Sequence, residues 1–265
     1  MGEPRRYRRS VLREVSIHTE DVRFAGAKGD VIGGYLAVSL EREPVPGVVL
    51  IHEVFGLDAH IRGVARRFAE AGFCALAPDL YSREGVPGPQ STETDPDPIW
   101  ELEAIRQAVC SFPDRRALGD IDGAAALLAA RSEADGDRIA AVGFCMGGTL
   151  AFLSGCTSSR FAGVVEFYGR VLYPELSAAK PIQPLELALN LDCPLLAFFG
   201  ELDEGIPSED LDRMRTTLAS AAKNFEIVCY PEARHGFFND RRPNHDPQAA
   251  EDAWRRTLTF LREDL

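Results

Sequence analysis

Hydrophobic residues along this chain fall into short unbroken runs that alternate with longer stretches of helical spacing. Clear runs occupy residues 47–51, 73–77 and 138–142. Runs of this kind are typical of strands that are buried on both faces of a parallel sheet. Between the first two runs, apolar residues from Ile61 to Ala71 recur at the spacing of a helix, and Gly72 follows as a stop signal. The pattern predicts a strand, a helix and a second parallel strand here.

The same alternation continues towards the C-terminus. Further strands are predicted at 163–167, 194–199 and 225–230, and helices around 100–110, 114–131, 208–218 and 247–261. Ser208 is predicted to cap one helix, and Asp246 followed by Pro247 to begin the last. Shorter runs at 15–17, 22–24 and 31–37 predict an antiparallel edge. The pattern favours an α/β fold in which helices cover both faces of a mostly parallel central sheet.

Two segments interrupt this alternation. Residues 78–98 are rich in Pro, Gly and Asp, which makes them too polar for a core and long enough to form a functional loop over a site. Residues 170–192 contain three prolines and are predicted to be irregular and to cover an edge of the sheet.

Composition and charge narrow the class of protein. With 265 residues, of which 45% are hydrophobic, the chain can bury one large core, so we expect a single domain over 15–265 after an N-terminal arm at 1–14. A net charge of −12 argues against nucleic acid as a partner, because neutralising phosphates requires a basic surface. The arginines at positions 5, 6, 8 and 9 lack the apolar segment of a signal peptide, and no apolar run is long enough for a membrane span. Six scattered cysteines without CxxC pairs indicate a cytoplasmic protein, which we expect to be a monomer or weak homo-oligomer.

The sharpest local motif is Gly-Phe-Cys-Met-Gly-Gly at 143–148, directly between a predicted strand and a predicted helix. This is the pattern of a nucleophile elbow, with Cys145 in the position that serine usually occupies. Gly143 and Gly147 would remove side chains where the strand and helix backbones crowd together. The helix N-terminus would favour the Cys145 thiolate, and its free N–H groups could hold an oxyanion. A buried core cysteine beside a glycine turn is the alternative.

Two further residues follow strands in the order expected for a catalytic triad. Asp203 lies just beyond the predicted strand at 194–199, and His235 just beyond the one at 225–230. The order nucleophile, acid, histidine is that of the α/β-hydrolase fold. The carboxyl ends of parallel strands are also where open α/β sheets build their sites. The sequence therefore predicts an α/β-hydrolase fold with a Cys145, Asp203 and His235 triad.

These residues resemble the dienelactone hydrolase (carboxymethylenebutenolidase) family over most of the chain, from about Val31 to Leu261. Besides the triad, the matching landmarks are Ile-His-Glu-Val-Phe-Gly at 51–56 and Ala-Pro-Asp-Leu-Tyr-Ser-Arg at 77–83. The resemblance implies that Glu53 pairs with the resting thiol and helps to generate the thiolate. It also implies an oxyanion hole from the backbone N–H groups of Val54 and Met146, and a substrate carboxylate bound by Arg83. From its position alone, Arg83 could equally form a salt bridge.

One position departs from the pattern. Dienelactone hydrolases of chlorocatechol pathways resemble this chain at the histidine but carry a second substrate-binding arginine four residues after it. This chain has Asn239 at that position. Arg241 and Arg242 do not match it residue by residue. This departure argues against dienelactone itself as the physiological substrate, but it does not affect the predicted hydrolytic chemistry.

Other chemistry is less well supported. A zinc motif of the form HExxH would start at His52 but meets Gly56 where the second histidine is required, so we expect no metal. No phosphate-binding glycine motif is present, and no organic cofactor is predicted. Phe55 and Tyr81 could line a substrate pocket or belong to the core.

The sequence thus predicts a hydrolase of a small ester or lactone, of the dienelactone type that gives maleylacetate-like products in aromatic degradation. The substrate could carry a carboxylate. The alternatives are a broad carboxylesterase or thioesterase of the same fold, a non-catalytic binding module, and a redox sensor based on Cys145.

Overall fold

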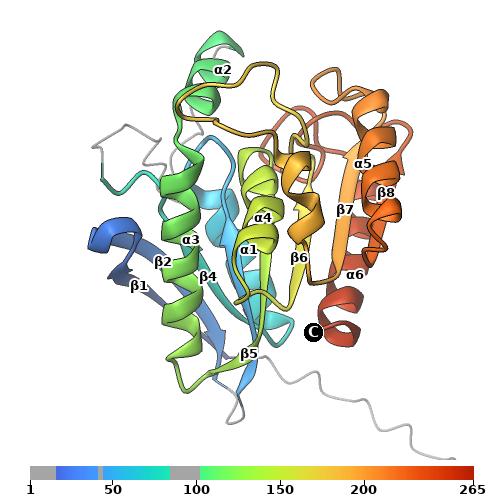
Figure 1. Ribbon diagram of the computed structural model, residues 1–265. Coiled ribbons are helices and arrows are strands. Elements are labelled where there is room, and N and C mark those ends of the chain that lie inside the picture. The colour runs from blue at the N-terminus through green and yellow to red at the C-terminus, as the bar shows by residue number, and fades with distance from the viewer. Residues whose placement is uncertain (1–15, 41–43, 84–101) are drawn as a thin grey trace, which may run out of the picture.

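The computed structural model describes residues 16–40, 44–83 and 102–265. Their strands form one eight-stranded sheet in the order β1-β2-β4-β3-β5-β6-β7-β8, shown in Figure 1. The strands are β1 (Ile17–Ala25), β2 (Val31–Ser39), β3 (Val45–Ile51), β4 (Cys74–Pro78), β5 (Ala134–Phe144), β6 (Gly163–Phe167), β7 (Leu195–Gly200) and β8 (Phe225–Tyr230). From β4 to β8 all neighbouring strands are parallel, as the unbroken apolar runs predicted.

An antiparallel edge completes the sheet and confirms the prediction for the N-terminal part. β2 pairs antiparallel with both β1 and β4. The extended runs predicted at 15–17 and 22–24 are not two strands, because β1 continues unbroken from Ile17 to Ala25. A short turn of 3₁₀ helix, η1 (Ala27–Gly29), joins β1 to β2, and Lys28 there has a positive φ of 59°.

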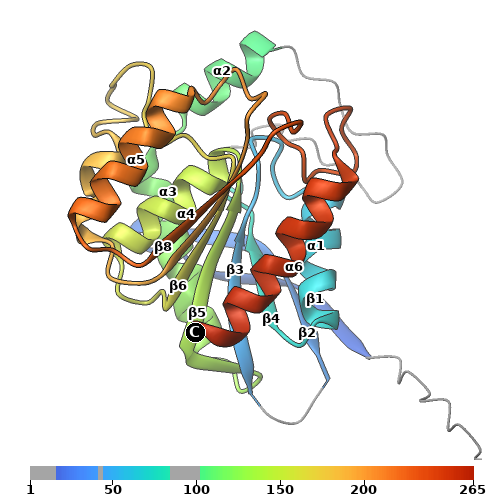
Figure 2. The same cartoon turned by 90° about the vertical axis from the view of Figure 1, so that its right-hand side faces the viewer.

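Helices cover both faces of the sheet (Figure 2). One face carries α1 (Ala59–Glu70) and α6 (Pro247–Glu263), and the other carries α3 (Asp114–Ala129), α4 (Met146–Thr157) and α5 (Ser208–Ser220). A further helix, α2 (Leu102–Ser111), precedes α3. Together with the sheet order, this is the predicted α/β architecture.

Local sequence signals explain where several helices begin. The Asp58 side chain accepts a hydrogen bond from Ile61 N–H at the start of α1, and Asp246 accepts from the N–H groups of Gln248 and Ala249 at the start of α6. The cap predicted at Ser208 is wrong, because Pro207 occupies the N-cap position of α5 and Ser208 is the first helical residue.

Residues 170–192 do not cover a sheet edge as predicted. They include the 3₁₀ helix η2 (Pro184–Asn190), which packs against α4 and α5. The reason is that α4 is apolar and buried almost all round, so its outer side needs a cover.

Several predictions concern residues outside those described. They are the N-terminal arm at 1–14 with its arginines, and most of the predicted loop at 78–98, of which only residues 78–83 are described. Within the described parts of the chain, no helix is long and apolar enough to cross a membrane.

Candidate active site

Cys145 lies on a sharp turn between β5 and α4. Its φ of 55° is in the left-handed region, which is unusual for a residue with a side chain. The Cys145 N–H donates to the Phe167 carbonyl at 2.9 Å, which ties the turn to the end of β6. Side chains are excluded on both sides: a Cβ at Gly143 would lie 1.9 Å from the Gly147 carbonyl oxygen, and one at Gly147 would lie 2.3 Å from the Ile51 oxygen. The strained turn leaves Cys145 half-buried at the start of α4.

His235 and Asp203 meet beside this turn, at the carboxyl ends of β8 and β7. His235 Nδ1 lies 2.6 Å from Asp203 Oδ2, and Asp203 Oδ1 accepts from the Gly205 N–H at 2.8 Å. Burial by itself lowers the pKa of His235, but the negative charges of a Cys145 thiolate and of Asp203 outweigh it and raise that pKa well above its ordinary value. The arrangement can therefore hold an imidazolium between a thiolate and a carboxylate.

Glu53 lies in the loop after β3, directly after His52, and its carboxyl is buried. Its Oε1 accepts from the Tyr168 hydroxyl at 3.3 Å, and its Oε2 accepts from Asn239 Nδ2 at 2.5 Å. Burial raises the pKa of Glu53, and the opposing effects of His60, the Asn239 hydrogen bond and His235 do not cancel it. The hydrogen bonds of the described residues thus join Glu53 to Tyr168 and Asn239, whereas the resemblance implied the resting thiol.

His52 is a structural residue in this arrangement. Its Nδ1 lies 2.6 Å from the Glu53 carbonyl oxygen, and its Nε2 accepts from the Leu80 N–H at 3.2 Å. Burial lowers the pKa of His52, which favours the neutral ring that these two contacts require. The ring therefore joins the chain after β3 to the chain after β4. Among the described residues, no group of three or more possible metal ligands is found.

The two residues predicted to form the oxyanion hole lie at the start of α4 and in the loop after β3. Met146 is the first residue of α4, where backbone N–H groups have no partner within the helix. Val54 follows Glu53, and its carbonyl accepts from the Tyr81 hydroxyl at 2.9 Å. Tyr81, predicted to line the pocket, is buried and packs on His52 and Phe112. The Phe55 ring is half-buried, with the Arg242 guanidinium 3.8 Å from its centroid.

Arg83 has a different environment from the one that the resemblance implies, and it forms the salt bridges that its position alone left open. Its guanidinium binds both oxygens of Asp120, the Asp30 carboxylate at 2.5 Å and the Ala27 carbonyl at 3.2 Å. Asp120 is fully buried, and these hydrogen bonds raise the pKa of Arg83. Because its donors are already bound to protein oxygens, the structure does not support Arg83 as the group that binds a substrate carboxylate.

Sequence reasoning missed two residues of the site. Tyr168 was not considered, and Asn239 was noted only as a departure from a family pattern. Both are fully buried and donate to Glu53. Tyr168 directly follows β6, so its place at the carboxyl end of a parallel strand could have indicated it.

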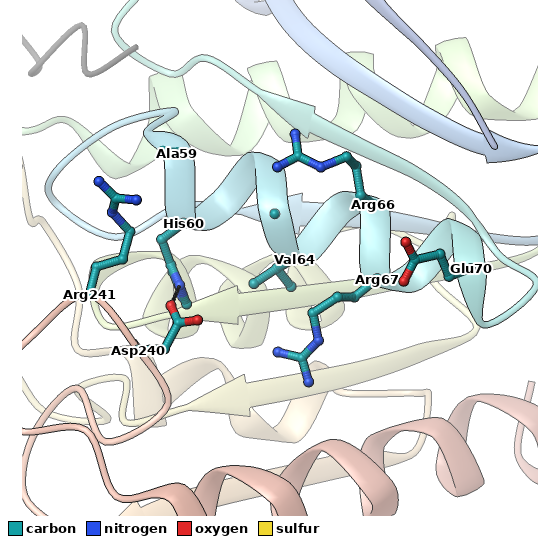
Figure 3. A pocket seen from close by; sticks show the side chains of 9 residues that line it. Ala59, His60, Val64, Arg66, Arg67, Glu70, Asp240 and Arg241 are labelled. Carbon is teal, nitrogen blue, oxygen red and sulfur yellow. Dashed lines mark hydrogen bonds and ion pairs between the residues drawn. The ribbon is translucent and has the colours of Figure 1, made fainter. Parts of the chain in front are cut away.

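A depression of about 350 Å³ lies on the surface near α1 (Figure 3). Its lining includes His60, Arg67, Asp240 and Arg241. His60 Nδ1 lies 3.0 Å from Asp240 Oδ1, on the segment that also carries Asn239. The lining residue Asp240 thus directly follows Asn239, which donates to Glu53, but Cys145 is not among the residues that line the depression.

Comparison with known proteins places this geometry in context. Residues 32–265 match the model of the "Dienelactone hydrolase family". A Methylorubrum extorquens protein named "Putative carboxymethylenebutenolidase" is 36% identical over 88% of this chain and 77% of its own length. A Bradyrhizobium protein named "Probable 2-oxo-3-(5-oxofuran-2-ylidene)propanoate lactonase" is 32% identical over 91% of this chain and 92% of its own.

A solved structure agrees with the sequence relatives. A crystal structure from Klebsiella pneumoniae, titled as a putative dienelactone hydrolase, superposes with a TM-score of 0.84 at 31% identity. The match covers 94% of this chain and 99% of the other.

Proposed function

Since this chain belongs to the dienelactone hydrolase family, we propose that it hydrolyses a small ester or lactone with Cys145 as the nucleophile and His235 and Asp203 as its partners. The observation that carries the proposal is the 2.6 Å contact between His235 and Asp203 beside the strained turn that holds Cys145. A charged histidine next to a thiolate is the resting state that a cysteine nucleophile needs.

The reaction begins when the Cys145 thiolate attacks the carbonyl carbon. Negative charge develops on the carbonyl oxygen, where the Val54 and Met146 N–H groups act as hydrogen-bond donors. The intermediate collapses as the bond to the leaving alkoxide or enolate breaks, and the His235 imidazolium gives that oxygen a proton. Water then attacks the thioester while neutral His235 takes its proton, which releases the acid and restores the thiolate–imidazolium pair.

The contacts favour the broader description, a small ester or lactone, over the dienelactone in particular. Arg83 is bound by Asp120 and Asp30, and Asn239 is bound to Glu53. Neither position at which the resemblance suggested a carboxylate-binding arginine offers a free cation. These two positions therefore give no reason to expect a substrate that carries a carboxylate. A broad carboxylesterase is the second candidate.

The test is turnover of p-nitrophenyl acetate and of cis- and trans-dienelactone by the wild type, by Cys145→Ala and by Cys193→Ala. Cys193 is a matched control, since it is also half-buried but burial raises its pKa to about 11. We expect loss of turnover by about 10³-fold or more in Cys145→Ala only. Equal turnover by all three proteins, or none with any substrate, would contradict the proposal and favour a binding module.

A further inference from the structure

The depression on α1 contains two oppositely charged side chains that are not joined to each other. Arg67 comes from α1, and Asp240 comes from the loop after β8. Figure 3 shows Val64 between the two charged groups. The volume of about 350 Å³ is in the range of pockets that hold small molecules, about 300–1,000 Å³. None of the proposed catalytic residues is in the lining, so a ligand here would be separate from the substrate.

The Arg67 guanidinium has N–H donors that the protein does not use. It lies 4.3 Å from the centroid of the Trp254 ring and 5.5 Å from that of Phe238, so aromatic rings hold it in place. Among the described residues, it forms no hydrogen bond and no ion pair. Partial burial lowers the pKa of Arg67, and the charges of Asp240 and Glu70 oppose that effect. The N–H groups of the guanidinium are therefore available to a carboxylate.

Asp240 supplies a carboxylate to the same depression. Its Oδ1 lies 3.0 Å from His60 Nδ1, which fixes the orientation of the group, and its side chain is 66% exposed. The contact with His60 lowers the pKa of Asp240, and the charge of Arg67 lowers it further, so the group stays ionised. Within the described parts of the chain, its Oδ2 has no hydrogen-bond partner. That oxygen can accept a hydrogen bond from a ligand.

Arg67 and Asp240 influence each other without forming an ion pair. Each shifts the pKa of the other towards the charged form, so the two groups are near each other. The ion pairs of the described residues nevertheless do not join them. Arg66 extends from α1 in the opposite direction and donates to the Tyr35 hydroxyl at 3.3 Å. The space between Arg67 and Asp240 is thus suited to a ligand that carries both charges.

We propose that this depression binds a free α-amino acid, with its carboxylate on Arg67 and its ammonium group on Asp240. The two charges of an α-amino acid are separated by a single carbon atom, which suits protein groups that are near but not in contact. A guanidinium binds a carboxylate through paired N–H donors, and Asp240 can accept from an ammonium group. A chain with a net charge of −12 repels simple anions, whereas a ligand without net charge meets no such opposition.

The test is a titration of the ¹⁵N-labelled protein with leucine, 4-methylpentanoate and 3-methylbutylamine. The three probes share one apolar side chain, but the second lacks the ammonium group and the third lacks the carboxylate. The readout is the indole N–H signal of Trp254, since the Arg67 guanidinium lies over this ring. The chain has two tryptophans, and Trp254→Phe identifies the signal. We expect a saturable shift with leucine and an affinity about tenfold or more lower for the other two probes.

Variants assign the binding to the two charged residues. Arg67→Gln and Asp240→Asn should each weaken leucine binding by about tenfold or more, because each removes one charged partner. Arg262→Gln is the matched control, since the Arg262 guanidinium also lies over a ring, 6.0 Å from the Phe73 centroid, but is not in the lining. Cys145→Ala should bind leucine as the wild type does, because the site does not include the thiol.

The outcomes decide the proposal without reference to turnover. It is overturned if leucine gives no saturable shift, if the three probes bind equally, or if Arg67→Gln and Asp240→Asn bind leucine as Arg262→Gln does. Loss of leucine binding in Cys145→Ala would assign the ligand to the hydrolase site and also overturn the proposal. If Arg67→Gln fails to fold, Asp240→Asn decides, since asparagine keeps an oxygen for the contact with His60. Failure of this site leaves the proposed hydrolysis by Cys145 unaffected.

Discussion

Two carboxyl side chains of the site lie in different environments, and this difference separates their roles. Asp203 accepts from a backbone N–H and faces His235, which can carry a positive charge. Glu53 accepts only from neutral donors among its described hydrogen bonds, and burial raises its pKa. Asp203 is thus suited to stabilise an imidazolium, whereas Glu53 is suited to exchange a proton.

Glu53→Gln should make the protein more stable and less active. A carboxyl whose folded-state pKa is raised binds a proton more readily in the folded chain, so stability falls as pH rises from the unfolded value of about 4.5 through the raised value. Glutamine carries no such charge and can still accept from Asn239. We expect Tm at pH 8 to rise by roughly 2–4 °C, the effect of about 1 kcal/mol in a chain of this size. The kcat/KM value should fall on the order of tenfold or more.

Thermal melts at pH 5 and pH 8 check this prediction. The gain in Tm over wild type should be larger at pH 8, because only there does the wild-type chain bear the cost of the buried charge. A gain that is equal at both pH values, or a loss of stability at pH 8, would show that Glu53 is not the origin of the effect.

Local motifs allowed part of the site to be predicted at the level of residues. Cys145 stands in a glycine-flanked motif, and Asp203 and His235 each follow an apolar run, so their meeting could be expected; the 2.6 Å contact confirms that the last two are neighbours. The pair of Glu53 and Asn239 could not be expected, because the donor is 186 residues away and no local pattern marks it. The ion pair between Arg83 and Asp120 could not be predicted for the same reason, since no local pattern marks Asp120 as the partner.

At the scale of elements, β5 and α4 can meet in a sharp turn only because two glycines lie there. A Cβ at Gly143 would be 1.9 Å from the Gly147 carbonyl oxygen, a contact that only backbone movement could relieve. We expect Gly143→Ala to lower the free energy of unfolding by about 3 kcal/mol or more. Urea denaturation measures this change.

Gly63→Ala on α1 is the matched control for this substitution. A Cβ there would meet only the end of the Arg66 side chain, at 3.9 Å, so the helix should gain about 0.5–1 kcal/mol from the better helix former. Similar denaturation midpoints for the two variants would contradict the assigned role of the elbow glycines.

Hydrophobic periodicity predicted most helices and strands, but it could not fix helix ends or locate η2. Buried parallel strands and the amphipathic helices α1 and α6 are strong patterns, since their apolar faces must match the layers that they contact. Helix ends are set by single hydrogen bonds, which is why Asp246 was predicted correctly and Ser208 was not. η2 could not be located, because its position depends on α4 needing a cover from another part of the chain.

At the scale of the whole molecule, one partly buried cluster joins the antiparallel edge to the helical layer. Arg83, just after β4, reaches Asp120 in α3, and Asp120 Oδ1 also accepts from the Ala27 N–H of η1 at 2.8 Å. Asp30, the residue before β2, binds the same guanidinium. The cluster thus joins the β1–β2 hairpin, the chain after β4 and α3 at one point.

Arg83→Gln should therefore destabilise the fold without changing substrate preference. It leaves the fully buried Asp120 carboxylate without its positively charged partner, and breaking a buried ion pair on one side costs about 3–5 kcal/mol. The double variant Arg83→Gln with Asp120→Asn should recover part of this loss, because asparagine keeps an acceptor for the Ala27 N–H without a buried charge. Urea denaturation of the two variants measures both effects.

Turnover is compared for p-nitrophenyl butyrate and mono-p-nitrophenyl succinate, which differ by a terminal carboxylate. If Arg83 acts only within the fold, the ratio of the two kcat/KM values stays at the wild-type value in Arg83→Gln. A selective loss of succinate turnover would instead return Arg83 to the substrate site, because a residue that only stabilises the fold has no means to distinguish the two esters.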